Sequence, residues 1–164
     1  MDEETRLAEL GLALPDLGGL SPSHYNAKLY GSKLQLLPNR KVGDLLFNSA
    51  VPTLKDKEFY RGRFGDTLTA EDGYKATQIA AVSGLAAMKY ALGNLDRVEQ
   101  ILRVIVFVVC TPEFTDLTRV GNGASDLFRH VFGDRGLHSR VDVGMTGIGR
   151  DQSIEMIMIS KFRD

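Results

Sequence analysis

Two patterns of hydrophobic and polar positions mark the last quarter of the chain. Residues 139–143 alternate charged and apolar side chains, with Arg140 and Asp142 on the same side of the alternation. Residues 153–160 are apolar in both alternating sets, apart from Glu155 and the serines at the ends. Alternation is typical of a strand, and apolar residues in both sets are typical of a strand buried on both faces. We therefore expect two final strands, the second in the interior.

The clearest helical pattern begins after Thr69. Thr69 and Asp72 have the spacing of a capping box, in which each side chain binds the other residue's backbone N–H. Apolar residues then recur at helical spacing up to Gly93, a residue type that favours the left-handed conformation that ends many helices. The alanines and Gly84 predict that this helix packs closely against a sheet.

The rest of the chain predicts shorter elements and an irregular arm at residues 12–33. The order is roughly β-β-β-α-β-α-β-β, an α+β fold with two helices on one face of a mixed sheet. The other sheet face is also apolar in several strands, so we expect a second subunit to cover it. The predicted elements are a helix at 3–10, strands at 34–37, 44–51, 58–64 and 101–109, a turn at 38–40, and a second long helix over much of 114–132, ending at Gly133.

Composition limits the class of protein. The 164 residues fit a single domain (1–164), with residues 1–33 as an N-terminal helix and arm. A net charge of −1 without a local cluster of Lys and Arg argues against nucleic-acid binding. The acidic start differs from a signal peptide, and no apolar run approaches the roughly 18–20 residues of a membrane span. One cysteine fits a reducing compartment. We expect a cytoplasmic protein.

Glu155 is the first candidate for chemistry, because a carboxylate inside a buried strand needs a partner, a shifted pKa or a wet cavity. Arg140 on the preceding strand is the nearest partner, and both side chains facing one cavity would form a small-molecule acid site. A structural salt bridge from Arg140 to Glu155 or Asp142 is the alternative. The chain's three histidines lack metal-ligand spacing, so we predict neither a metal nor a cofactor.

The chain resembles the Rid family, also called YjgF, of reactive-intermediate imine and enamine deaminases, particularly its longer members with an N-terminal helix. That resemblance implies a chorismate-mutase-like fold and a homotrimer, in which three sheets surround a central barrel and clefts lie between subunits. The matching segments, in order, are Thr5–Gly11, Val42–Ser49, Leu92–Val98, Asn122–Leu127 and Arg140–Glu155.

The resemblance also implies roles for individual residues. Arg140 matches the family's carboxylate-binding arginine, and Glu155 matches the acid that positions water. Asn122 corresponds to a helix asparagine and Ser49 to a strand serine. Three positions depart from the deaminase pattern: Ala50 follows Ser49 where glycine is usual, Leu36 stands in place of a tyrosine that lines the cleft, and Asp142 replaces a cysteine or alanine.

These matches predict a cofactor-independent deaminase or related C–N lyase that acts on a small carboxylated imine or enamine. The departures leave two alternatives: a catabolic enzyme for an aromatic-derived acid, of the aminomuconate deaminase or hydroxylaminobenzoate lyase type, and a trimer that binds metabolites without turnover. An endoribonuclease role, given to some relatives, is disfavoured by the acidic balance.

Overall fold

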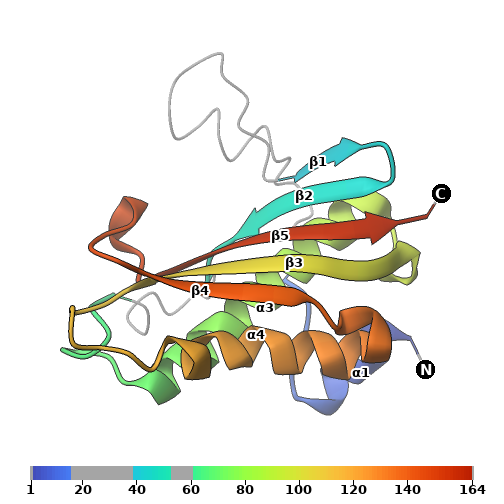
Figure 1. Cartoon of the computed structure of the whole chain (residues 1–164). Coiled ribbons are helices and arrows are strands. Elements are labelled where there is room, and N and C mark those ends of the chain that lie inside the picture. Colours follow the sequence, from blue (N-terminus) through green and yellow to red (C-terminus); the bar gives the residue numbers. More distant parts are fainter. Residues whose placement is uncertain (1, 16–38, 53–60, 164) are drawn as a thin grey trace.

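The computed structural model describes residues 2–15, 39–52 and 61–163. In this part of the chain, three α-helices and five strands follow one another in the order α1, β1, β2, α3, β3, α4, β4, β5 (Figure 1). Their bounds are α1 Glu3–Glu9, β1 Asn39–Val42, β2 Leu45–Ala50, α3 Ala70–Leu92, β3 Val98–Val109, α4 Leu117–Phe132, β4 Ser139–Met145 and β5 Ile154–Phe162.

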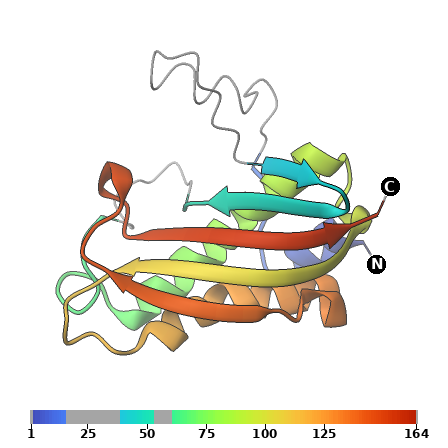
Figure 2. The same ribbon diagram turned by 45° about the horizontal axis from the view of Figure 1, so that its top comes forward.

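The strands form one mixed sheet in the order β1-β2-β5-β3-β4 (Figure 2). Only the β3–β4 pair is parallel, and it places Val104 beside Arg140 and Val106 beside Asp142. On the other side of β3, β5 runs antiparallel and pairs Glu155 with Phe107. β4 is therefore an edge strand of the described sheet, while β5 lies in its interior as the sequence predicted.

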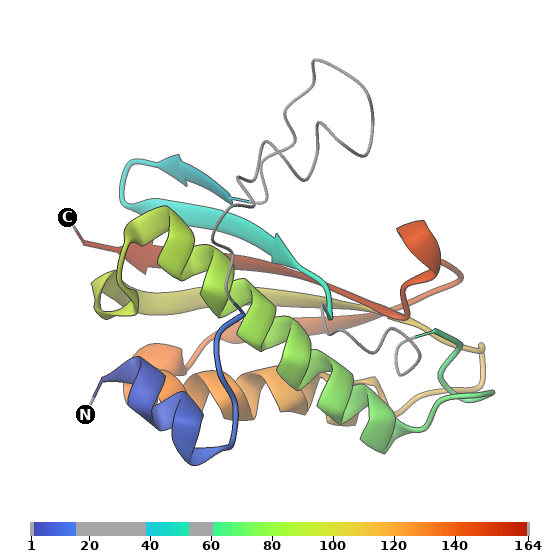
Figure 3. The same cartoon turned by 180° about the vertical axis from the view of Figure 1, so that it is seen from behind.

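Helices α3 and α4 cover one face of the sheet, and α1 packs beside them (Figure 3). The buried residues of β5, which include Met156 and Met158, point into this helical layer. Leu7 of α1 is 1% exposed, and Arg6 donates a hydrogen bond to the Val131 carbonyl oxygen of α4 (2.8 Å). The expected α+β fold, with two long helices on one face of a mixed sheet, is confirmed.

Glycines let α3 and α4 approach each other. A Cβ atom built on Gly123 of α4 would lie 1.9 Å from the Tyr74 carbonyl oxygen of α3. The Thr77 hydroxyl of α3 also donates a hydrogen bond to the Val120 carbonyl oxygen of α4. The predicted capping box at the start of α3 is present, and α3 ends at Gly93 as predicted.

The opposite sheet face carries apolar side chains that the described helices do not cover. Phe47, Val141 and Ile157 are 39%, 38% and 36% exposed, and they lie on neighbouring parts of this face. Side chains at alternate positions of β2 and β5 are buried against the helices. The sequence-based expectation of an apolar second face is therefore met.

The predicted turn at residues 38–40 is wrong, because residues 39–42 form β1 and the turn follows at Gly43, where φ is +57°. β1 is an exposed edge strand, so burial imposes no apolar alternation on it. The expected strand at 34–37 lies outside the described residues, as do residues 58–60 of the strand expected at 58–64. Residues 61–64 form only an isolated bridge at Phe64.

Gly123→Ala should destabilise the protein, although alanine favours helices over glycine by about 1 kcal/mol. The new methyl group would meet the rigid backbone of α3, and overpacking of this kind typically costs about 1–3 kcal/mol or more. Chemical denaturation would measure the change, with Gly147→Ala as control because no atom lies within 4 Å of its Cβ position. Equal stability of the two variants would contradict this helix packing.

Candidate functional site

Arg140 is the centre of a polar cluster between β4 and α4. Its side chain points from the edge strand toward the helix and is 14% exposed. The guanidinium donates to the Ser125 hydroxyl (2.6 Å) and the Asn122 side-chain oxygen (2.9 Å). It also donates to the Thr118 carbonyl oxygen (3.1 Å). Residues 118, 122 and 125 lie about one turn apart on α4, so one face of the helix holds the guanidinium.

Asp142 neutralises this charge. The Nε atom of Arg140 lies 3.1 Å from each carboxylate oxygen of Asp142, whose side chain is 10% exposed. Burial raises the pKa of Asp142 above its ordinary value of 3.8, and the neighbouring guanidinium opposes this shift without cancelling it. Its Oδ1 atom is buried and accepts no hydrogen bond from the described residues.

Gly121 makes the cluster possible. A Cβ atom at this position of α4 would lie 2.1 Å from Asp142 Oδ1 and 2.8 Å from Arg140 Nε. The absent side chain therefore leaves the volume that the ion pair occupies. Two glycines of α4 thus serve different contacts: Gly123 faces α3, and Gly121 faces the Arg140–Asp142 pair.

His138, directly before β4, extends the cluster. Its Nδ1 atom lies 2.7 Å from the Gly136 carbonyl oxygen, and its Nε2 atom lies 2.9 Å from the Ser125 hydroxyl. Its ring also meets the Phe128 ring edge-on, with centroids 5.7 Å apart. Burial lowers the pKa of His138 below 6.5, an effect that the Gly136 hydrogen bond partly opposes. His138 is therefore a neutral imidazole at neutral pH.

The structure brings together three of the sequence-predicted site residues, Arg140, Asp142 and Asn122, and separates them from Glu155. Arg140 faces α4, whereas Glu155 alternates with the buried residues of β5 and points to the opposite face of the sheet. The expectation that Arg140 and Glu155 face one cavity is therefore wrong within a single chain. Strand β3 lies between their two strands.

The remaining predicted residues lie apart from Arg140. Ser49 pairs with Ile157 on the sheet face that Glu155 shares, whereas Ala50 is buried on the helical side near Gly84. Leu36 lies outside the described residues.

Sequence reasoning missed Ser125 and Gly121 as parts of the site. The spacing of Ser125, three residues after Asn122, was the available signal, because such positions share a helix face.

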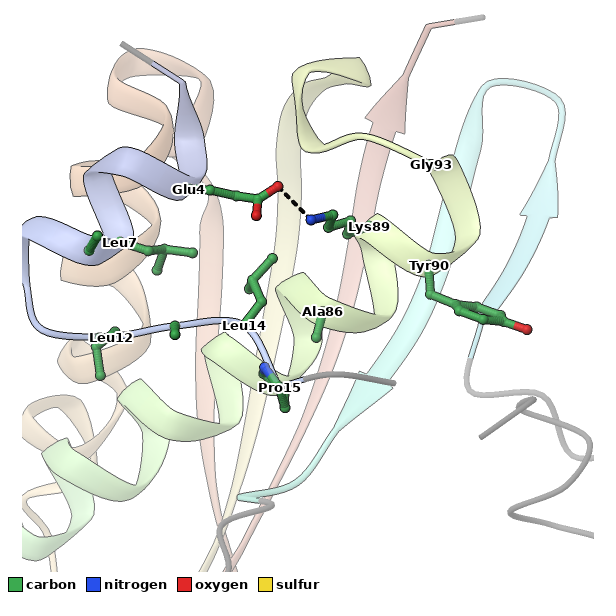
Figure 4. A pocket seen from close by; sticks show the side chains of 11 residues that line it. Glu4, Leu7, Leu12, Leu14, Pro15, Ala86, Lys89, Tyr90 and Gly93 are labelled. Atoms are coloured by element: carbon green, nitrogen blue, oxygen red, sulfur yellow. Dashed lines mark ion pairs between the residues drawn. The ribbon is translucent and has the colours of Figure 1, made fainter. Parts of the chain in front are cut away.

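A cavity of about 520 Å³ lies elsewhere, between α1, the segment after it and the C-terminal half of α3 (Figure 4). Leu7, Leu12, Leu14 and Ala86 line it, and an ion pair between Glu4 and Lys89 (2.7 Å) crosses one side. It contains none of the residues predicted for the site. The cavity is therefore distinct from the Arg140 cluster.

Metal ligands and membrane spans were also sought in the described residues. No group of three or more His, Cys, Asp or Glu side chains there could hold a metal ion. In the same residues, no helix is long and apolar enough to cross a membrane.

Comparisons with known proteins identify the family and the fold of the chain. Residues 4–149 match the family model described as "YjgF/chorismate mutase-like, putative endoribonuclease". The TCP17 protein of Trypanosoma cruzi is 31% identical over 154 residues, which cover 92% of this chain and 88% of the relative. The chain therefore belongs to the YjgF/chorismate mutase-like family, also called the Rid family.

Two solved structures are similar over nearly the whole chain. A protein of unknown function from Agrobacterium tumefaciens is 30% identical with a TM-score of 0.83, covering 98% of this chain and 91% of its own. A "putative endoribonuclease" from Shewanella oneidensis MR-1 is 26% identical with a TM-score of 0.84, covering 99% and 100%. The family and the fold are thus shown.

The His138 environment predicts a pH dependence of stability. Because folding lowers the pKa of His138, the unfolded chain binds the proton more tightly between the folded pKa and 6.5. The contribution of neutral His138 to the free energy of unfolding is complete above pH 6.5. It is lost as the pH falls from 6.5 to the lower pKa of the folded state. His138→Gln should remove this part of the slope, measured by denaturation between pH 5 and pH 8 (~0.5-unit steps).

His130→Gln is the control for that measurement, because His130 is exposed and bonds only to α1 among the described residues. An unchanged slope in His138→Gln would show that the imidazole titrates alike in both states.

Proposed function

We propose that this protein hydrolyses a small carboxylated imine or enamine and releases ammonia. Arg140 binds the substrate carboxylate, and no cofactor takes part. The observation that carries the proposal is the Arg140 cluster: a guanidinium that is mostly removed from solvent, held by α4 at the edge of the sheet, at the position of the family's carboxylate-binding arginine. A planar, permanently charged fork suits bidentate capture of a carboxylate.

Carboxylate capture requires a change in the contacts of Arg140. Its Nη2 atom donates to Asn122 and Thr118, while Nη1 donates one of its two hydrogens to Ser125. The second Nη1 hydrogen has no acceptor among the described residues. A substrate oxygen therefore binds first at Nη1, and the carboxylate completes a bidentate contact by displacing the neutral Asn122 oxygen from Nη2.

Asp142 orients Arg140 in this proposal. It holds Nε, on the side of the guanidinium away from the Nη1 atom that receives the substrate. The pair also weakens the attraction for anions, because the negative charge of Asp142 offsets the charge of the guanidinium. Substrates with an added donor group therefore gain more here than the simplest imino acids do, which keeps an aromatic-derived acid as the alternative substrate.

The proposed enzyme is a homotrimer in which a neighbouring copy completes the site. The uncovered apolar face supports this assembly, since exposed apolar patches commonly mark interfaces. Glu155 and Ser49 lie on that face, so they join Arg140 only where the sheets of two subunits meet. Positioning of the attacking water by Glu155 depends on this assembly.

A trimer that binds metabolites without turnover is the second candidate. The observation in its favour is that four of the five N–H hydrogens of the Arg140 guanidinium already have partners among the described residues, which also suits a purely structural ion pair. The endoribonuclease named in the family description is less consistent with a net charge of −1.

Arg140→Lys should lower kcat/KM for carboxylated imines by about 10²-fold or more, because lysine keeps the charge and loses the fork. Ammonia release from 2-imino acids, generated in the assay by an amino-acid oxidase, would measure the effect after subtraction of spontaneous hydrolysis. Arg119→Lys is the matched control, since its ion pair with Glu71 is exposed. Full activity of Arg140→Lys on every substrate would exclude the carboxylate contact.

Ile157→Glu should weaken the assembly, because it places a charge in the uncovered apolar face. Light scattering of the parent should give three times the 18.1 kDa chain mass, and the variant should give a smaller species. Leu10→Glu serves as control because Leu10 is exposed on the helical side. A monomeric parent would remove the inter-subunit site from the proposal.

A further inference from the structure

We propose that Ser125 and His138 form a proton relay for the ligand bound at Arg140. This inference deepens the proposed function and rests on it. It assigns the acid–base chemistry to two residues that lie beside Arg140 in the same chain, and it explains how protons move on the helical side of the sheet, where Glu155 of this chain does not reach.

The direction of each hydrogen bond in the relay follows from chemistry. The Gly136 carbonyl oxygen can only accept, so His138 Nδ1 carries the hydrogen that binds it. In the neutral imidazole, Nε2 is then a lone-pair acceptor, and the Ser125 hydroxyl must donate to it. The Ser125 oxygen in turn accepts from Arg140 Nη1. The order is therefore Arg140 to Ser125 to His138 to Gly136.

This arrangement prepares Ser125 to pass a proton. Its hydrogen already points at a basic nitrogen 2.9 Å away, while the guanidinium stabilises negative charge on its oxygen. When His138 gains a proton, Nε2 becomes the donor, and the Ser125 hydrogen must turn away from it. The freed Ser125 hydrogen can then be donated to a ligand bound at Nη1.

Other groups near Arg140 cannot take this role. Asp142 is committed to Nε, and its second oxygen is buried against Gly121. Asn122 and the Thr118 carbonyl do not titrate in the relevant range. The charged groups that act on His138 are Arg140, which lowers its pKa, and Asp142, which raises it. From α4 the ring meets only the Ser125 hydroxyl and Phe128 among the described contacts.

The relay accounts for every proton of the reaction. Water adds to the imine carbon, and one of its protons moves to Ser125 as the Ser125 hydrogen moves to His138 Nε2. The reverse transfer delivers a proton to the substrate nitrogen. The C–N bond of the carbinolamine then breaks, its hydroxyl proton leaves with the nitrogen, and the products are a carbonyl compound and ammonia. One imine and one water are consumed for each ammonia released.

The pH profile of kcat on the full-length protein tests the relay, using 2-imino acids generated by an amino-acid oxidase. In the parent, kcat should fall as the pH drops through the pKa of His138, which burial holds below its ordinary value of 6.5, because only neutral His138 accepts the proton. Ser125→Ala and His138→Gln should lower kcat at pH 8 by about 10²-fold and flatten this acid limb. Ser125→Thr keeps a hydroxyl, so this variant should retain both the kcat of the parent and the acid limb of its pH profile.

Three results would overturn the relay while leaving the proposed function in place. The first is an acid limb that survives in both Ser125→Ala and His138→Gln. The second is a limb that vanishes in Glu155→Gln instead, which would assign it to that carboxylate. The third is an Nε2–H tautomer of His138 at neutral pH, observed by ¹⁵N NMR of the parent. A parent that releases no ammonia from any imino acid would instead overturn the proposed function itself.

Discussion

A positive charge on the helical side of an edge strand is the constraint that organises this molecule. Removing a guanidinium from water costs several kcal/mol unless partners replace the lost solvent. Arg140 meets that requirement with Asp142 on its own strand and with Asn122 and Ser125 on α4. α4 can supply these partners only because Gly121 brings its backbone close to the strand, and Gly123 lets it pack equally closely on α3.

The division of polar groups between the two sheet faces follows from strand alternation. β4 directs Arg140 and Asp142 toward the helices, while β5 directs Glu155 the other way. A single chain therefore contains two partial sites, one rich in donors under α4 and one with a carboxylate on the apolar face. In the proposed trimer, contact between the sheets of two subunits brings the two partial sites together. The proposed acid–base residues, Ser125 and His138, both lie beside Arg140 in the same chain.

Sequence patterns predicted most of the fold and about half of the candidate site. The α3 capping box, the Gly93 stop and the two final strands were visible because capping and burial impose strict residue choices. β1 was not predicted because an exposed edge strand has no apolar alternation in its sequence. Within one chain, Arg140 and Glu155 do not share the predicted cavity, because spacing along two strands does not reveal which face each residue takes when β3 lies between them. Ser125 was missed because a single serine on a helix has no sequence pattern that marks a site. Its role becomes visible only in the structure, where it accepts a hydrogen bond from Arg140.

The central claim is that Arg140 binds the carboxylate of the ligand on the helical side of the sheet. A crystal structure of the protein with a stable 2-oxo acid product, such as pyruvate, tests it most directly. The account predicts that the carboxylate lies against Nη1 and Nη2 of Arg140, that Ser125 lies within hydrogen-bonding distance of the ligand, and that Asp142 still holds Nε. Pyruvate bound only in the cavity between α1 and α3, with all of the contacts of Arg140 unchanged, would contradict it.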